Sequence, residues 1–499
     1  MKTKRPIGRK LKVSFALLGL LASAIAILVL WPSSLPPEPD AETSRLIRNV
    51  RIIDTQNGTA SAPQSILVRD GMIEAIGVDL DNGGLPVYDA GGAFALPGFW
   101  DMHVHTFQLS PQLHLPLWVA SGVLNTRDMM DCPEESDSLI ACHDDKQAWN
   151  DAVSSGRLAA PRIVQVASFY LERPEMTAGE ARRLVQRYDA RGLNAIKIYN
   201  GLRPDAFAAA ADEAQARKLK LVGHLPKAVA LEEAIAAGQT SFEHAHIFAR
   251  HCFAGAEDWR EGRLDDLPAV ALAERIVTEH DAGRCATAMQ QMAEARAWFI
   301  PTHVTREEDA RAADPGFLDD PVLDYLDPLS RWAWNDDRSA TRDAFQGKRG
   351  SEALQSYFEL GLQLTGQAHD RGVPVLVGTD SPLGGFRYHD EMAHLVRAGL
   401  SPAEVLKAAT IDAARYAGEQ DNAGTIEAGK RADFILLAAN PLDSIVNTKR
   451  IEAVFHSGRL YDRARLDALL AFTRGQAAAP HNWSKLIWGF LWSSVNSEL

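Results

Sequence analysis

Cysteine is scarce in this chain, with four residues among 499, and none of the four stands in a CxxC spacing. Cysteine-ligated zinc sites and thiol redox sites of that motif are therefore excluded. Cys132 and Cys142 bracket one polar loop, and Cys252 and Cys285 bracket another segment. We expect two local disulfides, Cys132–Cys142 and Cys252–Cys285, because the amino-terminal segment described below predicts an oxidising compartment. Four free thiols are the alternative.

Positive charge is also in short supply. The 52 lysines and arginines face 65 aspartates and glutamates, which gives a formal net charge of -13. Residues 1–31 hold six of the basic residues and no acidic residue, so the rest of the chain carries 46 basic against 65 acidic groups, a net charge of -19. Nucleic acid binding needs a basic surface, and we therefore expect no nucleic acid partner.

Charge is absent altogether from residues 13–31, which are apolar and match the roughly 20 residues with which a helix crosses a bilayer. The basic residues precede this segment and the Pro-rich residues 32–40 follow it, so the positive-inside rule places the amino terminus in the cytoplasm. Residues 1–40 thus predict a basic tail, a single-pass transmembrane signal anchor and a linker, with the body periplasmic or extracellular. A cleaved signal peptide, leaving a secreted protein, is the alternative, although its apolar core would normally be only about 7–15 residues long.

Low-complexity tracts are missing too, and 46% hydrophobic residues is the composition of an ordinary globular protein. Short segments between 46 and 93 (RNVRIID, QSILVRD and MIEAIGV) alternate apolar and polar positions, as half-buried strands do. A matching set, ADFILLA and IEAVFHSGRL, lies at 432–460. We expect these two pieces, residues 41–93 and 419–465, to form one composite β-sandwich.

Between these pieces, strand candidates alternate with helical stretches. The candidates span 98–105, 122–127, 162–167, 194–199, 219–224, 240–244, 298–303 and 374–380. Eight alternations of strand and helix predict an α/β fold with a (β/α)8 TIM-like barrel over residues 94–418. The connections 250–300 and 304–350 are longer than plain loops, and we expect them to cover the mouth of the barrel and to determine ligand choice.

The carboxyl-terminal tail, residues 466–499, is rich in tryptophan. Trp483, Trp488 and Trp492 stand among other apolar residues in an otherwise polar stretch. Tryptophan favours membrane interfaces, so one interpretation places the tail on the membrane surface near the anchor. Packing against the body or against another subunit of a homo-oligomer is the alternative.

Six polar residues stand at the carboxyl ends of predicted barrel strands, which converge on one face of such a barrel. They are His103, His105, Lys197, His224, His244 and Asp380. Residues i and i+2 of a strand share a face, so His103 and His105 project together and can hold one ion. An isolated HxH is weak evidence, but its conjunction with four later strand ends predicts the binuclear metal site of a metal-dependent hydrolase.

The motifs LPGFWDMHVHT, GTD and SPAEVLKAATIDAARYAG followed by AGTIEAGKRADFILL resemble the amidohydrolase superfamily. The likeness is strongest to its imidazolonepropionase-like branch, which includes prolidase-type dipeptidases acting on Xaa-Pro and related substrates, and it covers roughly residues 46–462. The resemblance implies two divalent ions, usually zinc, bridged by a carboxylated Lys197. His103, His105 and Asp380 would hold the first ion, and His224 and His244 the second.

Formal charges agree with this assignment. Two divalent ions would outweigh the Lys197 carbamate, the Asp380 carboxylate and a bridging hydroxide by one positive charge, which suits the polarisation of a carbonyl. Lys197 paired with an acidic residue is the alternative for the lysine, and a helix cap is the alternative for Asp380. His246, two residues beyond His244, is the alternative ligand, although EH at the strand end fits the family pattern better.

Three further residues are candidate substrate contacts. Tyr199 shares a strand face with the lysine, Arg127 ends the second predicted strand, and His303 ends the seventh. In the resembled dipeptidases, similarly placed groups bind the substrate's carboxylate, which arginine can do through two parallel bonds. Arg127 paired with Asp128 or Asp131 is the alternative, and His303 is equally a supporting polar residue behind the site.

The prediction for function is cleavage of an amide bond in a small molecule, by attack of the bridging hydroxide, with Asp380 as the proton carrier. The favoured substrate is a dipeptide or an N-acyl amino acid with a free carboxylate. Hydrolysis of a cyclic amide (imidazolone-like or hydantoin-like) or of a lactone is the enzymatic alternative. A barrel that serves as a scaffold or binding protein is the non-enzymatic one.

Overall fold

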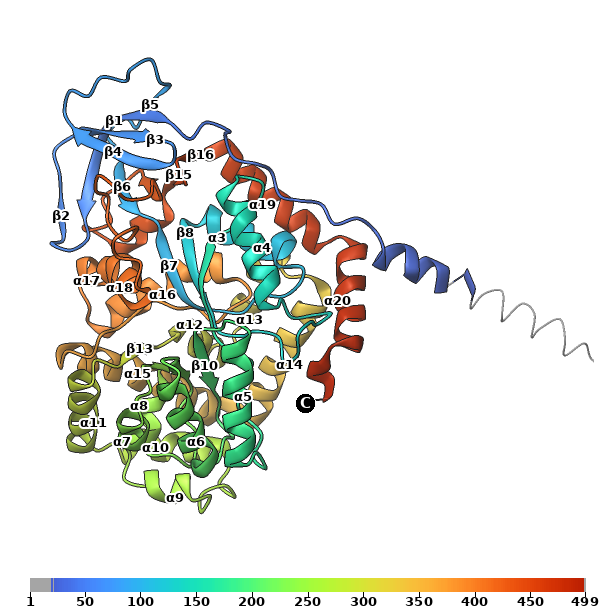
Figure 1. The fold of residues 1–499 in the computed structure, drawn as a ribbon. Helices are drawn as coiled ribbons and strands as arrows, with labels where there is room; N and C mark the ends of the chain where they lie inside the picture. The colour runs from blue at the N-terminus through green and yellow to red at the C-terminus, as the bar shows by residue number, and fades with distance from the viewer. Residues whose placement is uncertain (1–18, 21, 498–499) are drawn as a thin grey trace, which may run out of the picture.

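Strands from both ends of the chain share one sheet. The computed structural model describes residues 19–20 and 22–497 (Figure 1). The nine-stranded sheet has the main order β16-β15-β14-β6-β1-β3-β4, and β6 pairs with β14 in antiparallel register. Its strands are β1 (Arg45–Asp54), β2 (Thr59–Ala60), β3 (Gln64–Arg69), β4 (Met72–Gly77), β5 (Val87–Asp89), β6 (Phe94–Pro97), β14 (Phe434–Leu437), β15 (Ile451–His456) and β16 (Arg459–Asp462). The two predicted strand-rich segments are thus joined, and the domain boundaries stay predictions.

A buried carboxylate connects this sheet to the rest of the molecule. Asp433, one residue before β14, accepts hydrogen bonds from Arg162 Nη1 at 2.5 Å and from His456 Nδ1 at 2.9 Å. Burial by itself would raise the pKa of Asp433, but Arg162 and His456 outweigh it and hold that pKa far below its usual range. The charge is therefore retained at the junction.

The second sheet system is a ring of parallel strands. These strands are β7 (Phe99–Val104), β8 (Val123–Asp128), β9 (Arg162–Val166), β10 (Ala195–Ile198), β11 (Lys220–Gly223), β12 (Ser241–Glu243) and β13 (Trp298–Ile300). Single parallel bridges, Ala167–Ala195, Leu221–Gln239 and Phe299–Val375, connect the paired strands to one another. The predicted strand 374–380 is reduced to the bridge at Val375. The ring still closes there, because Met102 N donates to Val377 O at 2.9 Å.

Helices alternate with these strands and surround the ring (Figure 1). They are α2 (Ser110–Leu113), α3 (Leu115–Ala120), α4 (His143–Ser154), α5 (Ala178–Ala190), α6 (Pro204–Ala216), α7 (Leu231–Ala236), α8 (His246–His251), α9 (Ala256–Arg260), α10 (Ala269–Thr278), α11 (Ala282–Glu294), α12 (His303–Ala310), α13 (Pro315–Leu318), α14 (Pro328–Ala344), α15 (Gly347–Asp370), α16 (Gly384–Ala398), α17 (Pro402–Lys407) and α18 (Ala413–Ala417). Capping explains several starts: Thr177 Oγ1 accepts from Glu180 N, and the Glu180 carboxylate accepts from Thr177 N. The long connections 250–300 and 304–350 prove to be largely helical, and α10 and α12 both pack on α15.

The carboxyl-terminal tail forms α19 (Arg463–Ala477) and α20 (Pro480–Trp492). In α20, Leu486 is buried, and Gly489 O accepts a hydrogen bond from Ser138 Oγ at 2.8 Å. Trp488 and Trp492 remain 45% and 67% exposed. The tail therefore packs on the body through one face, as the second of the two interpretations expected.

The predicted transmembrane helix over 13–31 is contradicted. Residues 1–18 and 21 lie outside the described residues, and across 19–20 and 22–497 no helix has the length and apolar character needed to cross a membrane. The predictions of a transmembrane signal anchor and of a membrane-anchored localisation are therefore contradicted.

Both predicted disulfides are confirmed. Cys132 is bonded to Cys142 and Cys252 to Cys285, with Cα–Cα distances of 4.9 and 5.0 Å. The second bond closes the longer loop, because its two cysteines are 33 residues apart in the sequence and those of the first bond are 10 apart. It ties the end of α8 to α11, within the helical segment that follows β12.

Removal of the Cys252–Cys285 disulfide is expected to destabilise the protein more than removal of Cys132–Cys142. The double variant Cys252→Ser/Cys285→Ser should lose about 4 kcal/mol of unfolding free energy, and Cys132→Ser/Cys142→Ser about 3 kcal/mol, because the entropy lost on closing a loop grows with its length. Thermal and denaturant unfolding of the two variants and of the parent measure the difference. The opposite order would contradict the loop-length argument.

Candidate metal centre

One cavity of about 190 Å³ receives side chains from the carboxyl ends of the ring strands. Its lining residues are His103, His105, Tyr170, Lys197, Tyr199, His224, His244, His246, Arg306 and Asp380. All six residues predicted as metal ligands are in this list. They lie at or directly after the carboxyl ends of β7, β10, β11 and β12, or in the segment after Val375. The parallel ring is what brings them together.

His103, His105 and Asp380 form the first group of donor atoms. His105 Nε2 lies 3.1 Å and His103 Nε2 lies 3.6 Å from Asp380 Oδ1, and one ligand atom of each residue falls within 4.8 Å of the others. Asp380 N donates to His103 O at 2.8 Å, which fixes the carboxylate beside β7. Two imidazoles and one carboxylate at these separations could hold one divalent ion.

His224 and His244 form the second group. Their Nε2 atoms lie 2.9 Å apart. On the far side of each ring, His224 Nδ1 lies 3.0 Å from Asn200 Oδ1, and His244 Nδ1 lies 2.8 Å from Thr302 Oγ1. The carbonyl oxygen of Asn200 accepts from His224 Nδ1–H, so the lone pair of His224 remains on Nε2 and faces the other ring. A cation between the two rings would be bound by both.

His246, the alternative ligand, begins α8 and lies beside this pair. Its ring stacks on that of His244 with centroids 5.6 Å apart, and its Nδ1 atom is buried without a hydrogen-bond partner among the described residues. His244, rather than His246, faces His224.

Burial keeps these rings neutral. It lowers the pKa of His103 to about 4 and that of His244 to about 3, and it moves the pKa of His224 well below the usual range. Burial by itself would raise the pKa of Asp380, but the imidazoles of His103, His105 and His244 outweigh it and hold that pKa well below its usual range. Neutral imidazoles and an ionised carboxylate are the forms that bind metal ions.

Lys197 lies in the same cavity at 1% exposure, with its Nζ 3.4 Å from His103 Nε2. No carboxylate of a described residue lies within ion-pair distance of this amine, so the acidic partner considered from the sequence is not seen. Burial lowers the pKa of Lys197 to about 8, against the opposing effects of Asp380 and Glu243. A substantial fraction of the amine is therefore neutral near pH 8, as a reaction with carbon dioxide requires.

Arg127 does not line the cavity, which corrects its prediction as a substrate contact. It is fully buried, and its Nη2 atom donates to both carboxylate oxygens of Glu243 at 2.9 Å. Glu243 Oε2 also accepts from His103 Nδ1 at 3.0 Å. The partner is thus neither Asp128 nor Asp131, and the role of Arg127 is to hold Glu243 behind a candidate ligand.

The other two predicted substrate contacts differ from each other. Tyr199 lines the cavity, and its ring stacks on His224 with centroids 4.0 Å apart. His303 is fully buried at the start of α12, where Nε2 lies 3.0 Å from Thr365 Oγ1, and it does not line the cavity. A direct contact between His303 and a substrate is therefore not supported.

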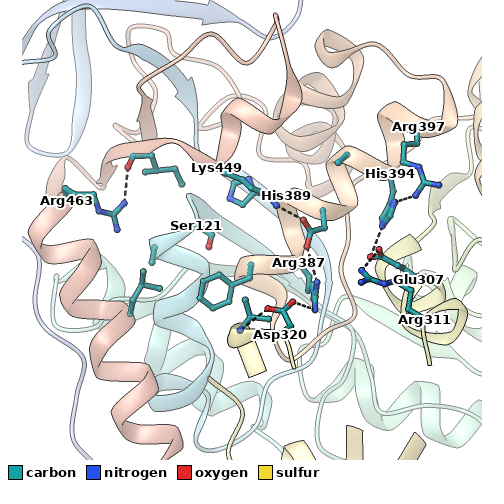
Figure 2. A pocket seen from close by; sticks show the side chains of 17 residues that line it. Ser121, Glu307, Arg311, Asp320, Arg387, His389, His394, Arg397, Lys449 and Arg463 are labelled. Atoms are coloured by element: carbon teal, nitrogen blue, oxygen red, sulfur yellow. Dashed lines mark hydrogen bonds and ion pairs between the residues drawn. The ribbon is translucent and has the colours of Figure 1, made fainter. Parts of the chain in front are cut away.

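A larger cavity of about 570 Å³ contains none of the six predicted ligands (Figure 2). Its charged side chains are paired with each other: Arg387 contacts Asp320 at 3.2 Å and Asp390 at 3.3 Å, and Glu307 contacts His394 at 3.2 Å. The lining charges are thus largely neutralised, and the cavity offers no cluster of free donors comparable to that at the strand ends.

Comparisons with known proteins point to one superfamily. Residues 337–461 match the model of the Amidohydrolase family. The chain is 40% identical over 82 residues to imidazolonepropionase of Thermoplasma acidophilum, which covers 15% of this chain and 19% of the relative. It is 33% identical over 112 residues to ochratoxinase of Aspergillus niger, which covers 22% and 23%. These matches, each over part of the chain, support membership of the amidohydrolase superfamily.

Solved structures of this superfamily share the fold over most of the chain. Bottromycin amidohydrolase aligns with a TM-score of 0.64 at 24% identity, over 92% of this chain and 94% of that one. A Xaa-Pro dipeptidase with bound methionine aligns with a TM-score of 0.59 at 19% identity, over 84% and 99%. The sequence matches to curated relatives span only 19% to 26% of those relatives' length. These structural alignments therefore establish the fold and not the substrate.

Several residues in or behind the cavity were missed by the sequence interpretation. Glu243 stands directly before His244, and this adjacency is the available signal for its role. Tyr170 and Arg306 line the cavity from a loop and from α12. No short motif marks either of them, because their positions depend on the path of long connections.

Replacement of Glu243 by Gln is expected to weaken both the fold and the site. The substitution leaves the buried Arg127 guanidinium without its counter-charge, which should cost about 3–5 kcal/mol of unfolding free energy. Metal affinity should fall roughly 10- to 100-fold, because a neutral amide replaces the carboxylate that accepts from His103 Nδ1 and orients the ring. Denaturant unfolding and competitive metal titration measure the two effects. The control is Glu74→Gln in an exposed ion pair with Arg69, where the expected loss is under about 1 kcal/mol.

Proposed function

We propose that this amidohydrolase superfamily member hydrolyses the amide bond of a small molecule and depends on two divalent metal ions, preferably zinc. The favoured substrate is a dipeptide or an N-acyl amino acid with a free carboxylate. The observation that carries the proposal is the second donor pair, two buried neutral imidazoles with Nε2 atoms 2.9 Å apart, next to a first group of two imidazoles and a carboxylate.

The donor set fits two ions. His103, His105 and Asp380 would hold one, His224 and His244 the other, and Lys197 would connect them. In its neutral form, Lys197 Nζ can bond to the carbon of carbon dioxide and release a proton, which gives a carbamate with two oxygens. The bound ions would supply a Lewis acid that polarises the scissile carbonyl and lowers the pKa of water.

Asp380 is the proposed proton carrier. Its low pKa means that it is ionised and able to accept a proton from the attacking water. Its Oδ2 lies 3.9 Å from His244 Nε2 and its Oδ1 lies 3.1 Å from His105 Nε2, so the carboxylate stands between the two donor groups. From there it can return the proton to the leaving amine. Tyr199 is the proposed substrate contact on the wall of the cavity.

Substitution of the central residues should abolish turnover without unfolding the protein. We expect Asp380→Asn and Lys197→Ala to lower kcat by roughly 10²–10⁴-fold or more, because each removes a group that the reaction needs. Turnover is measured on a panel of dipeptides, N-acyl amino acids, hydantoins and lactones, with circular dichroism as the check on folding. Lys449→Ala, in the larger cavity, is the matched lysine control and should keep parental turnover. Cleavage confined to hydantoins or lactones would favour the cyclic-substrate alternative.

Metal content tests the ligand set independently of substrate. Gently purified protein should hold two ions per chain, and His224→Ala should hold fewer because it removes half of the second donor pair. Elemental analysis measures the content, and metal removal by a chelator should also lower the melting temperature. A parent protein with less than one ion per chain would favour the scaffold alternative.

A further inference from the structure

A second cavity adjoins the candidate metal centre. It has a volume of about 320 Å³ and lies between α8, α9, α10, α12, α14 and α15, and its apolar lining residues include Leu272, Ala273, Ile276, Phe345, Leu354 and Phe358. We refer to it as the apolar groove. Its volume is about twice that of an engineered cavity of about 150 Å³ that binds benzene. The groove can therefore hold a bulky apolar group.

Arg306 connects the apolar groove to the metal centre. It lines the groove and also lines the cavity that contains the six candidate ligands. A small space between them is lined by His246 on the metal side and by Arg250 and Trp259 on the groove side. Arg306 thus forms a wall that the metal centre and the groove share.

The boundary between the two cavities carries excess positive charge. Arg306 Nη1 lies 2.7 Å from Asp309 Oδ2, so this arginine has one acidic partner. Arg250 lies over the ring of Trp259, 5.5 Å from its centroid, and no described carboxylate lies within ion-pair distance of it. Two arginines and one aspartate leave a net charge of one positive unit, which suits a substrate carboxylate.

A buried polar atom in the groove also lacks a partner. Tyr357 lines the groove, and its hydroxyl is buried without a hydrogen-bond partner among the described residues. Buried hydroxyls are normally hydrogen-bonded, because an unpaired one loses its contacts with water. This atom offers a hydrogen bond to a ligand that enters the groove.

From these observations we infer that the substrate's leaving amino acid has a bulky apolar side chain seated in the groove and a free carboxylate bound by Arg306 and Arg250. The side chain and the carboxylate of one amino acid are attached to the same carbon. The side chain can therefore enter the groove only if the carboxylate lies at the boundary between the groove and the metal centre, where the two arginines are. This inference rests on the proposed function and narrows its substrate class to N-acyl amino acids and dipeptides with a leucine-like or phenylalanine-like carboxyl-terminal residue.

Substrate preference gives the first test. The metal-loaded parent should cleave N-acetyl-L-leucine and N-acetyl-L-phenylalanine with kcat/KM roughly 10- to 100-fold above that for N-acetylglycine, which has no side chain to bury. Leu272→Trp, and independently Leu354→Trp from the opposite helix, should abolish this preference and retain cleavage of N-acetylglycine. Thr278→Trp, at an exposed position on α10 outside the groove, should retain it.

The possible results separate the two proposals. Cleavage of N-acetylglycine at the same efficiency as the bulky substrates would overturn the groove inference and leave the proposed function in place. No cleavage of any N-acyl amino acid or dipeptide would overturn the proposed function. In that case the groove is still tested by binding.

Equilibrium binding tests the arginines without turnover. Calorimetric titration of chelator-treated protein with N-acetyl-L-phenylalanine should show binding that weakens roughly tenfold or more in Arg306→Gln and in Arg250→Gln, since each variant removes a charge-assisted hydrogen bond. Arg342→Gln, an exposed arginine on α14 outside the groove, is the matched control and should bind like the parent. Equal affinity of all variants, or stronger binding of N-acetyl-L-phenylalanine amide, would overturn the assignment of the arginines.

Discussion

The Nε2 atoms of His224 and His244 lie 2.9 Å apart in a cavity where burial keeps both rings neutral. Hydrogen bonds on the opposite side of each ring fix this position of the two nitrogens: His224 Nδ1 contacts Asn200, and His244 Nδ1 contacts Thr302. The same construction recurs at His103, whose Nδ1 atom is bound by Glu243. Glu243 in turn needs Arg127, since a buried carboxylate without a counter-charge would be protonated or destabilising. The packing behind the rings therefore determines where their free nitrogens point.

This arrangement requires strained backbone at the strand ends. His244, Thr302 and Asp380 have φ values of +75°, +46° and +50°, a region that residues with a Cβ atom rarely adopt. Each strained position costs on the order of 1–3 kcal/mol and persists because its surroundings fix it. The fixing contacts are visible here, since His244 N donates to Ile300 O and Asp380 N to His103 O, both at 2.8 Å. Close packing also requires a glycine beside Lys197: a Cβ atom at Gly223 would lie 2.4 Å from Ile198 O.

The sequence predicted the parts of the molecule that follow from local patterns. Strand ends, the HxH pair and the lysine were all available from short motifs, and the two disulfides from spacing. The partner of Arg127 could not be predicted from the sequence. Glu243 lies 116 residues away, and only the order of strands in the ring brings the two side chains together. The transmembrane prediction depended only on the length and composition of residues 13–31, and across the described residues no helix has the length and apolar character needed to cross a membrane. The reduced eighth strand reflects the turn that presents Asp380, which a strand pattern does not encode.

Helix α12 borders the cavity of the candidate ligands, the apolar groove and the larger cavity. Arg306 on this helix faces the metal cavity and the apolar groove, whereas Glu307 lines the larger cavity and pairs with His394. The helix begins immediately after β13, at the buried His303, so its position is set by the ring. The groove's remaining walls come from α8, α9, α10, α14 and α15, none of which contributes one of the six candidate ligands, although α8 begins at His246. Side chains on α10, α14 and α15 can therefore change in size or charge without a change in the six candidate ligands. The residues that would hold metal ions and those that would select a substrate are thus separable in this fold.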